Sequence, residues 1–130
     1  MLTGIVKVIY LAVCGIAGNL MVVLAQESGG CLECCGFSEK NAIQALARLM
    51  KSNLSHIIKD GPVAALTGAA ERCDTSTVKK HLDNLQSNEE KSGYISLTLK
   101  LAEMAKKKQP DRDYRALEDL LHNYQRRIRT

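Results

Sequence analysis

The segment from residue 113 to residue 128 reads DYRALEDLLHNYQRRI. Its apolar residues recur at steps of three and four, which places their side chains on one face of an α-helix; they are Tyr114, Leu117, Leu121, Tyr124 and Ile128. Asp113 precedes the stripe and Arg126 and Arg127 lie near its end, as the helix dipole favours. Arg115 and Asp119 are spaced to pair across one turn. The segment predicts an amphipathic C-terminal helix packed on a core.

A second long helix is predicted over residues 38–59, with Ser38 as its N-cap. Gly61 and Pro62 would end it, and Pro62 would open a shorter helix reaching residue 70. The apolar residues of the long helix also recur at steps of three and four; they are Ile43, Leu46 or Ala47, Met50, Leu54, Ile57 and Ile58. We expect this stripe to face the core.

Between these helices the pattern is less uniform. A helix is expected to begin at Asp74, Thr75 or Ser76, and residues 87–93 are expected to form a polar connection. Residues 95–101 alternate apolar and polar, which is typical of a strand, but no second strand pattern offers a partner, so a helix is favoured there. The prediction is an all-α fold, a small bundle of four to five helices.

The N-terminus has the layout of a secretory signal peptide. Lys7 is followed by an uncharged, largely apolar run from Val8 to Ala25, and Ala25 is a suitable last residue before cleavage. The run approaches the roughly 20 apolar residues of a membrane span, so an uncleaved anchor is the main alternative and a buried helix the weakest. We expect a signal peptide over residues 1–25, a cysteine-rich, irregular arm over 26–37 and a helical domain over 38–130.

Four cysteines would remain after cleavage: Cys31, Cys34, Cys35 and Cys73. In a short secreted chain an even number of cysteines predicts a disulfide framework, here two bridges near the N-terminus of the mature chain. Pairing Cys31 with Cys34 and Cys35 with Cys73 is the simplest of three connectivities. A redox C-x-x-C motif is disfavoured because no strand precedes it, and a zinc site because Cys73 stands alone.

No pattern of catalytic or cofactor-binding residues is present. The histidines His56, His81 and His122 lie on three predicted helices without metal-ligand spacing, and no phosphate-binding or dinucleotide fingerprint occurs. Lys and Arg number 18 against 14 Asp and Glu, an excess too small to indicate nucleic-acid binding. We therefore expect a protein that is not an enzyme and needs no cofactor or metal.

Two motifs suggest processing. Asn53-Leu54-Ser55 is an acceptor for N-linked glycosylation in a eukaryotic secretory pathway, and the expected protein is therefore a glycoprotein. Residues 106–108 form a lysine run that a proprotein convertase would recognise, although lysine runs are usually left uncut.

These features predict a secreted, extracellular protein that binds another protein, such as a receptor. In general form the chain resembles short-chain four-helix cytokines, a resemblance of architecture without shared motif residues. The expected contact residues are Arg115, Arg126 and Arg127. The alternatives are a carrier of a small hydrophobic ligand and a membrane-active or host-defence protein acting through its basic C-terminal helix. Contact with a membrane or an anionic polysaccharide is a further option for the basic clusters.

Overall fold

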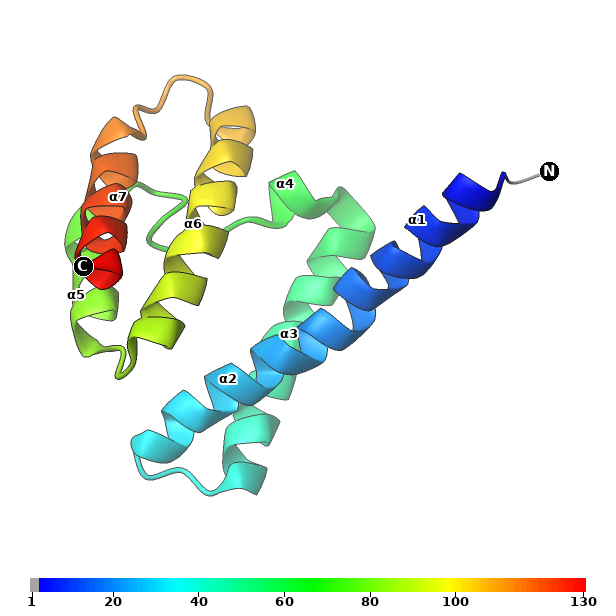
Figure 1. Cartoon of the computed structure of the whole chain (residues 1–130), viewed down its shortest axis with the longest axis horizontal. Coiled ribbons are helices and arrows are strands. Elements are labelled where there is room, and N and C mark those ends of the chain that lie inside the picture. Colours follow the sequence, from blue (N-terminus) through cyan, green and yellow to red (C-terminus); the bar gives the residue numbers. More distant parts are fainter. Residues whose placement is uncertain (1–2) are drawn as a thin grey trace. The chain divides into compact units, whose positions relative to one another are not determined.

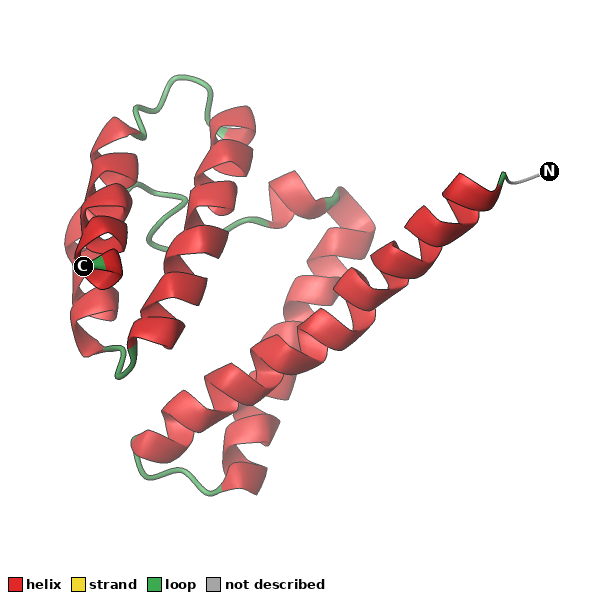
Figure 2. Cartoon of the chain, in the orientation of Figure 1, coloured by secondary structure: helices red, strands yellow, loops and turns green. Residues whose placement is uncertain are grey.

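The computed structural model describes residues 3–130, and these residues form helices and connections without a strand (Figures 1 and 2). The predicted all-α class is confirmed. The helix count is higher than expected: six, if the continuous helix Gly4–Cys34 is taken as one. Its parts are α1 (Gly4–Cys14), the π-helical turn η1 (Gly15–Asn19) and α2 (Leu20–Cys34); then follow α3 (Glu39–Asp60), α4 (Pro62–Ala65), α5 (Thr75–Asn84), α6 (Asn88–Lys108) and α7 (Arg115–Arg129).

The chain divides into two compact units, and the division falls within α3, between Lys51 and Ser52. In the N-terminal unit, α1 and η1 have no buried residue, and α2 buries only Gly29. Ala42, the one buried residue of α3, belongs to the same unit. Large apolar side chains from Ile5 to Leu24 are between 42% and 74% exposed. The N-terminal helix therefore exposes apolar side chains on all sides from Val8 to Leu24 and contributes no large side chain to a core.

Residues 26–34 correct the expectation of an irregular arm, because they continue α2 as regular helix to Cys34. The helix stops where Gly36 adopts a φ of 95°, a left-handed conformation that glycine tolerates best. The amide of Phe37 then donates to the carbonyl of Leu32 at 3.2 Å. Asn41 donates its amide to the Ser38 hydroxyl at 3.2 Å, so Ser38 caps α3 as predicted.

The C-terminal unit contains the hydrophobic core. Its buried residues come from α5, α6, α7 and the segments beside them; they are Ala70, Val78, Leu82, Ile95, Ala102, Ala105, Tyr114, Leu117, Leu121 and Tyr124. The stripe predicted for the last helix accordingly faces this core, with Leu117 and Leu121 fully buried. Ile128 packs against the cluster from its edge. This agreement follows from the spacing of the apolar residues, which makes a continuous buried face.

Two helix boundaries differ from the predictions for local reasons. Helix α4 is only four residues long because Leu66 leaves the helical conformation, with a ψ of 135°, and Gly68 follows with a φ of 101°. The expected polar connection over 87–93 is wrong, because α6 already begins at Asn88. Ser87 accepts the amide of Glu90 at 3.0 Å and the Glu90 carboxylate accepts the amide of Ser87 at 3.3 Å, which makes a capping box. Asp74 caps α5 through the amide of Thr77.

Candidate interaction surfaces

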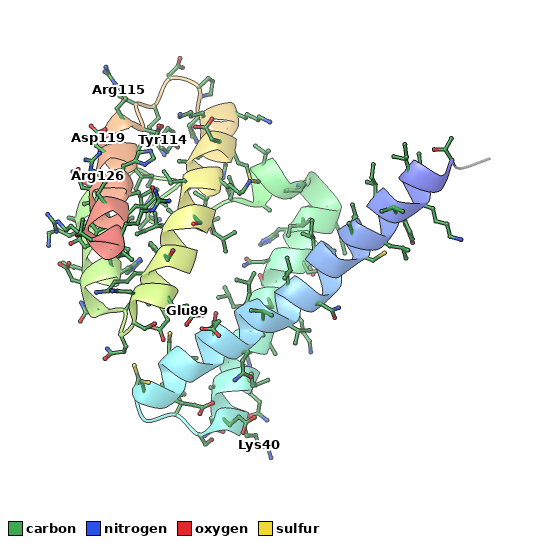
Figure 3. All side chains as sticks on the ribbon, viewed as in Figure 1. Lys40, Glu89, Tyr114, Arg115, Asp119 and Arg126 are labelled. Carbon is green, nitrogen blue, oxygen red and sulfur yellow. The ribbon has the colours of Figure 1, made fainter. Side chains whose placement is uncertain are left out.

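The outward side of α7 carries a row of exposed polar residues opposite its buried stripe. Arg115, Asp119, His122, Arg126 and Arg129 recur at steps of four and three, and all are exposed. Figure 3 shows Arg115, Asp119 and Arg126 along one edge of the helix. At 1.5 Å per residue, Arg115 and Arg126 lie about 16 Å apart along the axis. Two of the three predicted contact residues therefore share one face.

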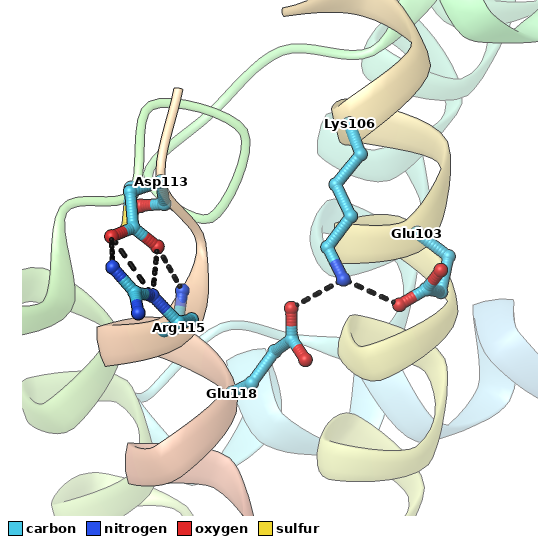
Figure 4. Close-up of polar contacts among 6 residues, drawn as sticks. Glu103, Lys106, Asp113, Arg115 and Glu118 are labelled. Carbon is cyan, nitrogen blue, oxygen red and sulfur yellow. Dashed lines mark hydrogen bonds and ion pairs between the residues drawn. The ribbon is translucent and has the colours of Figure 1, made fainter. Parts of the chain in front are cut away.

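Arg115 is held by Asp113 and not by Asp119, which corrects the expected pair (Figure 4). Its Nη2 lies 2.7 Å from Oδ2 of Asp113, and its backbone amide donates to Oδ1 of the same carboxylate at 2.9 Å. These bonds to Arg115 lower the pKa of Asp113 to about 2. Because Asp113 directly precedes Tyr114, the N-cap residue of α7, and bonds the first amide of the helix, it holds the Arg115 guanidinium near the helix end while leaving it exposed.

Arg127 lies on a different side of α7, in contact with a neighbouring polar cluster. Its guanidinium carbon is 5.0 Å from the ring centroid of Tyr124, a cation–π contact. The Tyr124 hydroxyl donates to Asp83 of α5, which also accepts from Lys79 at 2.5 Å. Hydrogen bonds from Lys79 and then Tyr124 lower the pKa of Asp83. The three arginines predicted as contact residues are therefore divided between two environments.

Lysines of the run 106–108, the candidate processing site, make contacts within the fold. Lys106 bridges Glu103 on its own helix at 2.8 Å and Glu118 on α7 at 2.6 Å (Figure 4). The hydrogen bond to Glu103, and then the one to Glu118, raises the pKa of the Lys106 ammonium. Lys108 donates to the carbonyl of Leu66 at 2.5 Å. Since residues 106–108 form the last turn of α6, a protease that needs an extended substrate would require this turn to unfold.

Sequence reasoning missed a strap formed by residues 66–74. The carbonyl oxygen of Glu71 accepts the Tyr114 hydroxyl at 2.5 Å and Nη1 of Arg112 at 2.9 Å. The thiol of Cys73 donates to the carbonyl of Asp113 at 3.4 Å. These contacts join residues 40 to 43 positions apart. The strap anchors the start of α7, and no local motif predicts a contact at that separation.

The apolar stripe of α3 is the main exception to the predicted core. Ile43, Leu54, Ile57 and Ile58 are 44%, 54%, 40% and 77% exposed. Leu46, Ala47 and Met50 are half-buried. The helix therefore has the pattern of a core helix, but most of its large apolar side chains are accessible. Asn53, the glycosylation acceptor, is exposed on the same helix.

The expected disulfides are not formed: no two of the five cysteines, all within residues 3–130, are bridged. The local reason is that residues 31–34 are the last turn of α2, not an irregular knot, and Cys34 and Cys35 are exposed there. Cys73 has a left-handed backbone, with a φ of 58°, and uses its thiol in the strap. Oxidative pairing of Cys31, Cys34, Cys35 and Cys73 stays a prediction for the secreted chain.

Among residues 3–130 no group of three or more His, Cys, Asp and Glu side chains could hold a metal ion. His81 instead lies edge-on to Tyr94, with ring centroids 5.9 Å apart and Nδ1 at 2.9 Å from the hydroxyl oxygen. Burial raises the pKa of Tyr94. His56 and His122 are exposed on α3 and α7.

Comparison with known proteins gives a family but no described activity. No curated protein and no solved structure matches the chain. One family does match, over residues 3–101, and this stretch includes the N-terminal helix, α3 and most of α6. Helix α7 lies outside the matched residues. Because the match covers well over half of the sequence, the chain belongs to the family described as Domain of unknown function (DUF2520).

Proposed function

We propose that this chain is a small secreted protein, not an enzyme, which loses residues 1–25 and then acts outside the cell by binding another protein. The observation that carries the proposal is the N-terminal helix. It is long and apolar enough to cross a membrane, and its most apolar stretch contains no buried residue. Such a segment in water would be costly, so a membrane or a translocation machinery is its natural environment.

Removal of this segment would leave the folded core intact. The clustered core residues lie between Ala70 and Tyr124, so all of them stay in a chain that begins at Gln26. A retained anchor would also explain the exposed apolar side chains. Cleavage is favoured by the small residue Ala25 and by Glu27 and Glu33, which follow it in place of a basic stop-transfer flank.

Mass spectrometry of the product tests secretion. The full chain would be expressed in a secreting eukaryotic cell line, and the medium and the membrane fraction would be analysed separately. We expect a soluble product whose peptide mass begins at Gln26, with a glycan mass on Asn53 that is absent from Asn53→Gln. Comparing masses after alkylation with and without reduction counts the disulfides. An intact chain in the membrane fraction would replace the signal peptide with an anchor.

The binding part of the proposal concerns the arginines of α7. Arg115, Arg126 and Arg127 are exposed, and none belongs to the buried cluster. We expect Arg115→Glu, Arg126→Glu and Arg127→Glu together to abolish binding of the labelled secreted protein to receptor-bearing cells. The matched control is Lys80→Glu, Lys100→Glu and Lys107→Glu, which reverses three exposed charges on α5 and α6. Undiminished binding by the arginine variant, with unchanged thermal unfolding, would exclude these arginines as contact residues.

The alternatives gain less support. A membrane-active C-terminal helix would present its apolar face to lipid, but Leu117, Leu121 and Tyr124 of α7 are buried in the folded unit. A carrier needs an enclosed space for its ligand, whereas Leu82, Ile95 and Leu117 are fully buried within one packed cluster. A protein-binding role uses the surfaces that the fold leaves exposed.

A further inference from the structure

Helix α3 has a second distinctive feature besides its exposed apolar stripe: its basic residues gather on one side. With 3.6 residues per turn, Lys40, Arg48, Lys51 and Lys59 fall in a sector of roughly 100° that adjoins the stripe. All four are exposed, and Figure 3 shows Lys40 near the start of the helix. None of them takes part in an ion pair among the described residues.

The other flank of the stripe lacks such charges. It carries the exposed residues Leu49, Asn53 and His56, and the acidic residues of α3 are confined to its ends, Glu39 and Asp60. The surface thus has an apolar centre, one basic border and one border without a lysine or arginine. We call the stripe together with Lys40, Arg48, Lys51 and Lys59 the α3 surface.

This asymmetry distinguishes among possible occupants. In an antiparallel pair of α3 helices the two basic borders would face each other, which repels; in a parallel pair each basic border would face Asn53, which offers no negative charge. A helix lying in a bilayer interface carries lysines or arginines along its polar face, where they reach lipid phosphates on both sides. Here only one border could do so, and the glycan acceptor Asn53 lies on the other.

We propose that the α3 surface docks into an apolar groove of a partner protein whose rim is acidic along one side. This inference rests on the proposed function and goes beyond it, because it adds a second contact surface to the α7 arginines and names the chemistry of the partner that this surface fits. Apolar contacts from Leu54, Ile57 and Ile58 supply the affinity, as in other helix-in-groove complexes. Lys40 and Lys51, nearest the stripe, meet the acidic rim and fix which way the helix lies.

The test uses a defined probe, a fluorescein-labelled synthetic helical-hairpin peptide whose two helices form an apolar leucine groove with glutamates along one rim. Secreted protein purified from medium is titrated with this peptide and binding is followed by anisotropy. We expect Lys40→Glu with Lys51→Glu to weaken binding about tenfold, and Ile57→Ser with Leu54→Ser to abolish it. Lys100→Glu with Lys107→Glu, two exposed charges on α6, is the control and should bind like the unmodified protein.

A charge exchange makes the test specific for orientation and sign. A second peptide carries lysines in place of its glutamates and should bind the Lys40→Glu, Lys51→Glu protein better than the unmodified one. In a parallel experiment the protein is titrated with phosphatidylcholine vesicles, with and without phosphatidylserine. Sedimentation of the protein alone measures whether it dimerises. No binding to the acidic peptide, loss of binding in the α6 control, binding to the anionic vesicles through the same residues, or dimerisation abolished by Leu54→Ser would overturn the proposal. An intact chain in the membrane fraction would instead contradict secretion, and the peptide titrations are then made on that protein in detergent.

Discussion

Helices α3 and α7 carry apolar stripes of the same spacing, but only the stripe of α7 is largely buried. On α7, Leu117 and Leu121 are fully buried; on α3, Leu54 is 54% and Ile58 77% exposed. Helix α7 packs against α5 and α6 within the C-terminal unit. An apolar stripe therefore indicates that a helix needs a packing partner, but it does not indicate whether that partner belongs to the same chain.

Truncating one leucine on each helix tests this difference in burial most directly. We expect Leu121→Ala to lower the free energy of unfolding by about 2–5 kcal/mol, because it leaves a cavity in the core. Leu54→Ala should change it by less than about 0.5 kcal/mol, because that side chain is already half in water. Chemical denaturation of the two variants measures both values. Equal losses would mean that α3 buries its stripe within the folded chain.

A second difference is the polar anchor at the start of α7. The Tyr114 hydroxyl donates to the carbonyl of Glu71 at 2.5 Å in a buried position. Tyr114→Phe should cost about 1–1.5 kcal/mol of unfolding free energy, because the carbonyl then keeps only the bond from Arg112. Tyr94→Phe, which removes an exposed hydroxyl contact to His81, serves as the control and should cost less than about 0.5 kcal/mol. A neutral Tyr114→Phe would show that packing alone holds α7.

The strap that carries Glu71 depends on the turn at Gly68. Gly68 has a φ of 101°, so Gly68→Ala should destabilise the fold by about 1 kcal/mol. Gly93 lies in α6 with open space beside it, and Gly93→Ala should stabilise the fold by about 0.5–1 kcal/mol. Thermal unfolding of the two glycine variants gives the opposite signs. If Gly68→Ala is not destabilised, the turn at Gly68 is not strained by a side chain; if Gly93→Ala is destabilised, the expected gain from alanine within α6 is wrong.

The contrast also explains which parts of the fold the sequence could predict. The stripe from Tyr114 to Ile128 predicted a buried face correctly, because short connections place α5, α6 and α7 beside one another. The Gly61–Pro62 stop and the Ser38 cap are local signals and were also correct. Ser87 and Glu90 form a capping box with an equally local signature, but the polar composition of 87–93 was interpreted as a connection.

The surfaces were less predictable, because they depend on contacts distant in sequence or on local competition. Arg115 had two acidic neighbours, and the structure favours Asp113, which also accepts its backbone amide. The Glu71 strap joins residues more than 40 positions apart and has no motif. The asymmetric charge of α3 is visible in the sequence, but it indicates a binding surface only together with the exposure of Leu54, Ile57 and Ile58, which the sequence does not show.

The weakest effect that we predict concerns the pH dependence of the starts of α3 and α7. Helix α3 is capped by the neutral hydroxyl of Ser38, whereas the first amide of α7, that of Arg115, donates to the carboxylate of Asp113. The pKa of Asp113 is lowered to about 2, chiefly by Arg115. Because that pKa is lowered, the carboxylate stabilises the fold above about pH 4, and the contribution is lost as the pH falls through about 2. NMR titration should show Arg115→Gln raising the pKa of Asp113 toward 3.8, while Arg126→Gln leaves it near 2. If Asp113 already titrates near 3.8 in the unmodified protein, the Arg115 contact does not persist in solution, and α7 would begin, like α3, without a charge-dependent contact.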